Sequence, residues 1–142
     1  MRALGLRDGI AFPQLIATTG GVRVVEVAAR IAAGQMADLV SFGTGISLFD
    51  IASAQALGDE VPDRLVTPRF RRPIAIRFLT ASPGVLPVGT IGSIDGLDAV
   101  RASPGMLAAS LYVGAGATIR PVQVDADRSG YVIATAATPS KA

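Results

Sequence analysis

The stretch GVRVVEVAARIAAGQMADLV, residues 21–40, decides the fold that the sequence predicts. Residues 22–29 read as a β-strand, and a Gly-Gly turn separates them from a second apolar segment, IAFPQLIATT at 10–19. Two strands joined by a glycine-rich turn predict an antiparallel hairpin. Within the second strand stands Glu26, one of only two glutamates in the chain. Since glutamates are almost never fully buried unless paired, Glu26 either faces solvent or faces a site.

The pattern also predicts the neighbours of Glu26. Strict alternation along a strand places it on one face with Val22, Val24 and Ala28. Its partner across the hairpin is expected near Gln14, a second polar residue inside an apolar run. A random pattern of polar residues does not predict that two of them lie opposite each other inside apolar strands.

Two helices are predicted after the hairpin. Residues 35–45 carry apolar residues at helical spacing and end in glycines. Residues 47–58 begin with Ser47 as the N-cap, followed by Asp50 three positions on as in a capping box, and end at Gly58. The charged, proline-punctuated segment 61–72 that follows is the predicted linker.

The remaining sequence, 73–142, predicts a small β-rich α+β unit, so the fold class of the whole chain is α+β (mixed α/β). Strands are expected at 74–81, 84–92, 107–113, 117–124 and 130–138, with a short helix at 95–105. Asp95 and Asp98 are expected to cap that helix. Asp125 and Asp127 are expected to solvate a turn.

Composition limits the classes of function. The chain has 142 residues, half of them hydrophobic, which suits a folded domain or two small ones. No apolar run is long enough for a membrane span or resembles a signal peptide, which favours a cytoplasmic protein. The absence of cysteine and histidine from the sequence excludes thiolate and imidazole chemistry. Any metal must therefore be held by oxygen ligands, which favours magnesium, manganese or calcium.

Glu26, Arg30 and Gly34 form the strongest candidate site. A carboxylate at a strand end can ligate a hard cation, an arginine four residues on can reach phosphate oxygens, and a glycine at a helix start lets backbone N–H groups approach an anion. Together they predict a magnesium–phosphate site, and the alternative is a structural ion pair at a strand end. The basic cluster RFRRP at 69–73 can grip phosphates or nucleic acid, and its alternative is a solvated linker.

Several segments carry a resemblance to a known family. Residues 4–58 resemble the C-terminal end of an ATP-grasp domain, closest to the carboxylate–amine ligases that include the L-amino acid ligases. The segments AIRFLTASPGVL, GLDAVRASPGM and DRSGYVIATAATPSKA resemble the small C-terminal domain of such ligases. The resemblance implies three parts: the end of an ATP-grasp domain at 1–60, a linker at 61–72, and a β-rich ligase domain at 73–142.

The resemblance also implies roles for individual residues. Glu26 is implied as a magnesium ligand that bridges ATP phosphates, and Gln14 stands where the family usually has its other metal-binding glutamate. Arg30 is implied as a catalytic and cofactor-binding residue near the phosphates or the acyl phosphate. Gly34 is implied in the turn that closes the site. The chain departs from the family pattern at Ala28, where much of the superfamily has asparagine.

The implied function is that of a C-terminal fragment of an ATP-dependent ligase, with ATP and Mg²⁺ as cofactors and an amino-acid-like substrate. Such a fragment is expected to be inactive until the missing N-terminal lobes complete it. The alternative is a non-catalytic remnant that acts as a binding or oligomerisation module, either as a homo-oligomer or with the missing half. Binding of nucleic acid through 69–73 is a more distant alternative.

Overall fold

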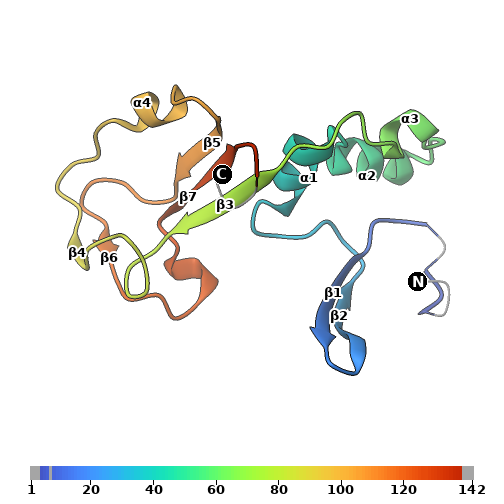
Figure 1. Cartoon of the computed structure of the whole chain (residues 1–142), viewed down its shortest axis with the longest axis horizontal. Coiled ribbons are helices and arrows are strands. Elements are labelled where there is room, and N and C mark those ends of the chain that lie inside the picture. The colour runs from blue at the N-terminus through green and yellow to red at the C-terminus, as the bar shows by residue number, and fades with distance from the viewer. Residues whose placement is uncertain (1–3, 7, 139–142) are drawn as a thin grey trace. The chain divides into compact units, whose positions relative to one another are not determined.

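The computed structural model describes residues 4–6 and 8–138 of the chain (Figure 1). The chain divides into two compact units, Met1–Arg71 and Arg72–Ala142. The division lies inside the segment that the sequence predicts as a linker. The assignment of residues 1–60 and 73–142 to two domains of a ligase stays a prediction.

The first unit opens with the expected hairpin. Strand β1 (Phe12–Thr18) pairs with strand β2 (Gly21–Ala28) in an antiparallel, two-stranded sheet. The Thr18 hydroxyl donates to the Gly21 carbonyl at 2.7 Å, and Gly21 has a φ of 98°, which a glycine adopts without strain. The Thr18 hydroxyl and the backbone conformation of Gly21 therefore stabilise the turn.

A β-bulge in β2 changes which side chains share a face. Gln14 pairs with Glu26, whereas Leu15 pairs with Val24, so that Val25 is the extra residue. Cross-strand partners lie on the same face of a sheet. Val24 therefore lies on the face of Leu15, and Glu26 lies on the other face with Gln14.

The bulge makes the two faces of the hairpin chemically different. The face that holds Gln14 and Glu26 also holds the pair of Ile16 and Arg23. The opposite face holds Leu15, Val24 and Val22, all more than half exposed. The expectation that Glu26 shares a face with Val22 and Val24 is wrong, because strict alternation does not survive an inserted residue.

Both predicted helices of the first unit are confirmed. Helix α1 (Met36–Thr44) ends at Gly45, which has a φ of 78°. Helix α2 (Leu48–Leu57) begins as predicted: the Ser47 hydroxyl accepts from the Asp50 N–H at 3.2 Å. Its C-cap Gly58 takes the left-handed conformation and donates its N–H to helix carbonyls.

The linker segment contains a short helix that the sequence did not predict, α3 (Asp63–Val66). Beyond it, Arg69 is tied to the end of α1. Its backbone N–H donates to the Thr44 carbonyl at 2.9 Å, and its guanidinium donates twice to the Gly45 carbonyl, at 3.1 and 2.6 Å. A cation at a helix C-terminus satisfies unpaired carbonyls and complements the helix dipole. Arg69 of the basic cluster thus has a structural role.

The second unit is built on a three-stranded antiparallel sheet. The strand order is β3 (Ile74–Leu79), β7 (Gly130–Thr135), β5 (Met106–Leu111). The central strand carries Ile133, which is completely buried, and the neighbouring Ala109 of β5 is buried as well. The last strand along the chain therefore closes the core of this unit, between two strands that precede it.

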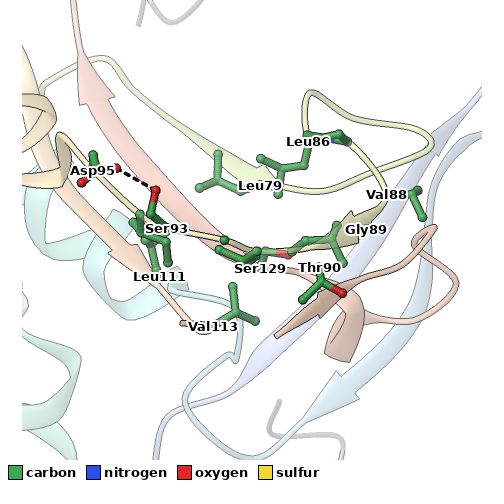
Figure 2. A pocket seen from close by; sticks show the side chains of 15 residues that line it. Leu79, Leu86, Val88, Gly89, Thr90, Ser93, Asp95, Leu111, Val113 and Ser129 are labelled. Atoms are coloured by element: carbon green, nitrogen blue, oxygen red, sulfur yellow. Dashed lines mark hydrogen bonds between the residues drawn. The ribbon is translucent and has the colours of Figure 1, made fainter. Parts of the chain in front are cut away.

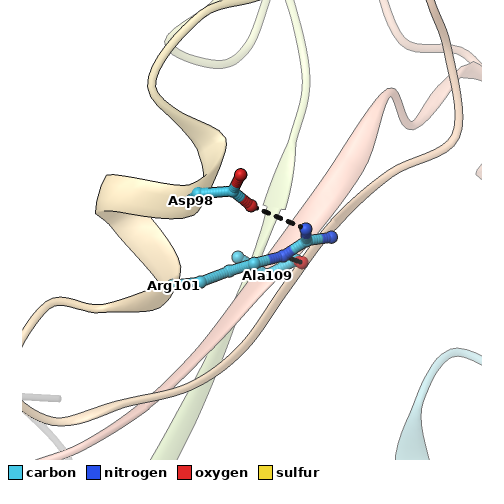
Figure 3. Close-up of polar contacts among 3 residues, drawn as sticks. All are labelled: Asp98, Arg101 and Ala109. Carbon is cyan, nitrogen blue, oxygen red and sulfur yellow. Dashed lines mark hydrogen bonds and ion pairs between the residues drawn. The ribbon is translucent and has the colours of Figure 1, made fainter.

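A short helix is fastened to the edge of this sheet. Helix α4 (Leu97–Arg101) ends with Arg101, whose Nε donates to the Ala109 carbonyl of β5 at 3.0 Å and whose Nη1 pairs with Asp98 at 3.2 Å (Figure 3). The helix N-cap is Gly96, without a side-chain hydrogen bond. The prediction that Asp95 and Asp98 cap this helix is wrong, because Asp98 turns to Arg101 and Asp95 accepts from the Ser93 hydroxyl.

The remaining elements of the second unit are short. Strands β4 (Gly89–Thr90) and β6 (Thr118–Ile119) form a separate antiparallel pair, where the sequence predicts strands over 84–92 and 117–124. A single 3₁₀ turn, η2 (Asp125–Asp127), precedes β7. Glycines and prolines shorten both strands, since proline cannot donate to a ladder.

The exposed carboxylate of Asp127 holds the turn at η2. The N–H groups of Gln123 and Val124 donate to Asp127 Oδ2 at 2.9 and 3.0 Å. These two hydrogen bonds hold the pKa of the Asp127 carboxyl below its ordinary value, and the charge of Arg120 acts in the same direction. The expectation that Asp127 serves a turn is confirmed, with backbone N–H groups as its partners.

The fold class predicted from the sequence, α+β (mixed α/β), is confirmed. No helix among the described residues is both long and apolar enough to cross a membrane.

Candidate functional site

Gln14 and Glu26 meet across the hairpin as the sequence predicts. They are register partners, and the register shifts immediately after them. Both side chains are exposed, on the polar face of the hairpin. The register therefore places one carboxylate and one amide side by side on an accessible surface, on the face that also holds Ile16 and Arg23.

This pair offers few ligands to a cation. Among the described residues, no group of three acidic, histidine or cysteine side chains is placed to hold a metal ion. Gln14 adds one neutral oxygen to the single carboxylate of Glu26. Mg²⁺ is commonly bound through one or two carboxylates, with water and substrate phosphates supplying its other ligands. The donor set is compatible with a cation that a nucleotide brings to it.

Arg30 lines a cavity that Gln14 and Glu26 do not line. Its Nη1 donates to the adjacent Ile31 carbonyl at 3.1 Å. It lines a cavity of about 380 Å³ together with Asp8 and, from α2, Gln55. Gln14, Glu26 and Gly34 are not among the described residues that line this cavity, so the structure does not gather all four predicted residues into one pocket.

Gly34 stands where the turn enters α1. It has a φ of 68°, and the following Gln35, the N-cap of α1, has a φ of 66°. A residue with a side chain takes this left-handed conformation at a cost of about 1–2 kcal/mol, which explains a glycine here. The sequence expected a glycine next to a helix start, and that position is confirmed.

A larger cavity, which the sequence did not suggest, lies in the second unit. Its volume is about 470 Å³, and Figure 2 shows its lining. Apolar side chains from β3, β5 and the β4 segment surround it, and Ser93 and Asp95 stand at one end. The sequence signal for this cavity is the interrupted apolar run GVLPVGTIGSI at 84–94, whose residues 84–92 predict a strand.

A family model matches the second half of the chain. Residues 77–142 match the model described as L-amino acid ligase C-terminal domain 2. The chain is also 32% identical, over its full length, to the uncharacterized protein y4rH of Sinorhizobium fredii (strain NBRC 101917 / NGR234). The chain spans 28% of the length of that curated relative.

Solved structures show the same fold at low sequence identity. The L-amino acid ligase of Bacillus licheniformis aligns with a TM-score of 0.75 at 23% identity, over 99% of this chain and 34% of the ligase. The phosphoribosylglycinamide synthetase of Anaerococcus prevotii aligns with a TM-score of 0.73 at 16% identity, over 99% of this chain and 35% of the synthetase. The resemblance drawn from the sequence is therefore confirmed: the chain has the fold of the C-terminal portion of an ATP-grasp ligase, and its residues 77–142 match the second C-terminal domain of the L-amino acid ligases.

Proposed function

We propose that this chain is the C-terminal portion of an ATP-dependent carboxylate–amine ligase that acts through an acyl phosphate. The observation that carries the proposal is the register of the hairpin, which pairs Gln14 with Glu26 on its polar face. The substrates are an amino-acid-like carboxylate and an amine, and the setting is cytoplasmic. The family match of residues 77–142 and the fold shared with an L-amino acid ligase support this choice of reaction.

In this proposal Glu26 and Gln14 hold a magnesium ion that is already bound to the phosphates of ATP. Such an ion neutralises the charge that moves between phosphate oxygens during transfer. Glu26 supplies the one negative ligand and Gln14 the neutral one. Because charge dominates affinity for a hard cation, Glu26 contributes more to binding than Gln14.

Arg30 and Gly34 act on the anionic part of the same site. The Arg30 guanidinium can exchange its hydrogen bond to Ile31 for a bond to a phosphate or acyl-phosphate oxygen, and charge-assisted bonds of this kind are the stronger ones. Gly34 precedes the start of α1, and the proposal assigns the backbone N–H groups of this turn to an anion. Arg30 is thus proposed as the catalytic residue, and Gly34 as part of the cofactor-binding turn.

The proposal requires polypeptide that this chain does not supply. The chain covers 34% of the L-amino acid ligase that shares its fold. The apolar face of the hairpin is open: Leu15, Val22 and Val24 are 55, 63 and 65% exposed. We infer that the remaining lobes of such a ligase cover this face and complete the nucleotide site, so that the chain alone has no ligase activity.

The same open face supports a second candidate, a non-catalytic module that assembles with itself. Contiguous exposed apolar surface marks sites of protein association. In that case Gln14 in place of a carboxylate reflects a site that no longer binds metal. Sedimentation equilibrium across a concentration range separates the two: self-association that Val24→Lys abolishes favours the module, and a monomer at high concentration excludes it.

A thermal-shift titration with ATP and Mg²⁺ tests the nucleotide site. Ligand at about a hundred times its dissociation constant adds roughly 2.7 kcal/mol to the free energy of unfolding, which raises Tm by several degrees. We expect Glu26→Gln to remove the shift. Glu60→Gln is the matched control, because Glu60 is the other glutamate, is exposed and lies in the segment before α3.

The titration is made on the chain alone and on the chain supplied with the other lobes of a related ligase. A shift with the lobes that Glu26→Gln removes and Glu60→Gln retains supports the proposal. No shift in either form, or equal loss in both variants, would rule out Glu26 as a metal ligand.

A further inference from the structure

We propose that the cavity of the second unit binds a small primary amine that carries a hydrocarbon body. The inference goes beyond the proposed ligase site, because the cavity is lined by residues of the second unit alone. The cavity has a volume of about 470 Å³, inside the range of 300–1,000 Å³ that is typical of small-molecule sites.

The body of the cavity is apolar. Figure 2 shows side chains from separate segments around it: Leu79 of β3, Leu86, Leu111 of β5, and Val113. Val88, which is 56% exposed, also lines the cavity. A hydrocarbon group that enters the cavity leaves water at about 25 cal/mol for each Å² buried. The site therefore selects for an apolar body.

The walls of the cavity are fixed by backbone hydrogen bonds. The Leu86 N–H donates to the Thr80 carbonyl at 3.0 Å, which holds the loop after β3. The Ile91 N–H donates to the Ala117 carbonyl at 2.9 Å, which continues the pairing of β4 with β6. A cavity that exists before its ligand arrives saves the entropy of ordering its walls.

The polar end of the cavity is an acid. The Ser93 hydroxyl donates to Asp95 Oδ2 at 2.9 Å, as Figure 2 shows, and this bond orients the carboxylate. Among the described residues that line the cavity, Asp95 is the one with a charge. It also lines a second cavity of about 250 Å³.

These features define the ligand by its charge. An ammonium group offers three donors and a positive charge to the Asp95 carboxylate. Ser93 donates to one of the two carboxylate oxygens, Oδ2. A carboxylate at the same place meets a like charge and is rejected. An alcohol of the same shape can donate one hydrogen bond without the charge. The order of affinity expected is amine, then alcohol, then acid.

Three probes of one shape test this order: 3-phenylpropylamine, 3-phenylpropanol and 3-phenylpropanoate. Each is titrated into the full chain labelled with ¹⁵N, and the shifts of backbone amides are followed. We expect the amine to bind about tenfold more tightly than the acid, a preference of about 1.4 kcal/mol. The amides that move should be those of 86–95 and 111–113.

Two variants and a control locate the binding. Asp95→Asn should bring the amine down to the affinity of the alcohol. Asp98→Asn removes the same charge three residues away, outside the cavity, and should leave the order unchanged. Val88→Trp enlarges a side chain that lines the cavity and should weaken all three probes; Val88 is exposed enough to accept the larger side chain.

The proposal is overturned by equal affinity for the amine and the acid, by binding that Val88→Trp does not weaken, or by shifts confined to other parts of the chain. The absence of shifts with all three probes at millimolar concentration overturns it as well. Each of these results leaves the proposal for Glu26 unaffected, because none of the probes carries phosphate.

Discussion

The hairpin of the first unit and the sheet of the second unit use similar residues with opposite results. Val24 in the middle of β2 is 65% exposed, whereas Ile133 in the middle of β7 is completely buried. Both strands are rich in β-branched residues. The difference is in their neighbours: β2 pairs with β1 alone, whereas β7 lies between β3 and β5.

This difference shows which part of the chain is self-sufficient. A two-stranded hairpin alone is marginal in water, and three strands with an apolar face are needed for independent stability. The second unit meets that requirement and adds Arg101, which fastens α4 to β5. The hairpin meets it only when further structure covers the face of Leu15, Val22 and Val24. In the proposed ligase, the other lobes supply this cover.

Truncation of one side chain in each region tests the comparison most strongly. Ile133→Ala should lower the free energy of unfolding of the second unit by about 2–5 kcal/mol, because it leaves a cavity in a packed core. Val24→Ala should change it by less than about 0.5 kcal/mol, as is usual for an exposed site. Urea unfolding of each variant gives both values. A large loss from Val24→Ala in the isolated chain would mean that the hairpin face is already covered by self-association.

Two glycine substitutions in the second unit test how closely its backbone segments approach each other. Gly105 has a φ of 82°, and a Cβ there would lie 2.7 Å from the Thr135 carbonyl oxygen of β7. Gly116 has a φ of 85° but open space around it. We expect Gly116→Ala to cost about 1 kcal/mol for the left-handed conformation, and Gly105→Ala to cost about 2–3 kcal/mol because the clash adds to it. Equal losses in thermal unfolding would contradict the close approach of Gly105 to Thr135 of β7.

The sequence predicted elements whose signals are local. Ser47 as an N-cap, Gly58 as a C-cap and the pairing of Gln14 with Glu26 all follow from residues a few positions apart or joined by a tight turn. The position of Gly34 beside the start of α1 follows in the same way, from a glycine ahead of a helical pattern. The residues in and next to each of these features are enough to predict it.

Features that depend on distant residues were missed. The bulge at Val25 reverses the face of Val24 relative to Glu26, and no residue type in VRVVEV marks it. Arg69 bonds to Gly45 across 24 residues, and the cavity of the second unit needs β3, β4 and β5 together. Roles that require a nucleotide or another lobe, such as those of Glu26 and Arg30, stay predictions for the same reason.

Acid should weaken the turn before β7 and leave the hairpin turn unchanged. This is the smallest of the three predicted effects. The Asp127 carboxylate holds the turn before β7, and hydrogen bonds from Gln123 and Val124 keep its pKa below the ordinary 3.8. A carboxyl whose pKa is lower in the folded state contributes stability above its unfolded pKa and loses it as the pH falls through the folded pKa. The hairpin turn depends instead on the Thr18 hydroxyl, which does not titrate in this range. As the pH falls below the ordinary pKa of the carboxyl, we therefore expect the protection of the Gln123 and Val124 amides to fall relative to their intrinsic exchange rates, with no matching change at the hairpin turn. Asp127→Asn, which keeps a neutral acceptor, should remove this acid-induced change; if the variant still shows it, another group controls the turn.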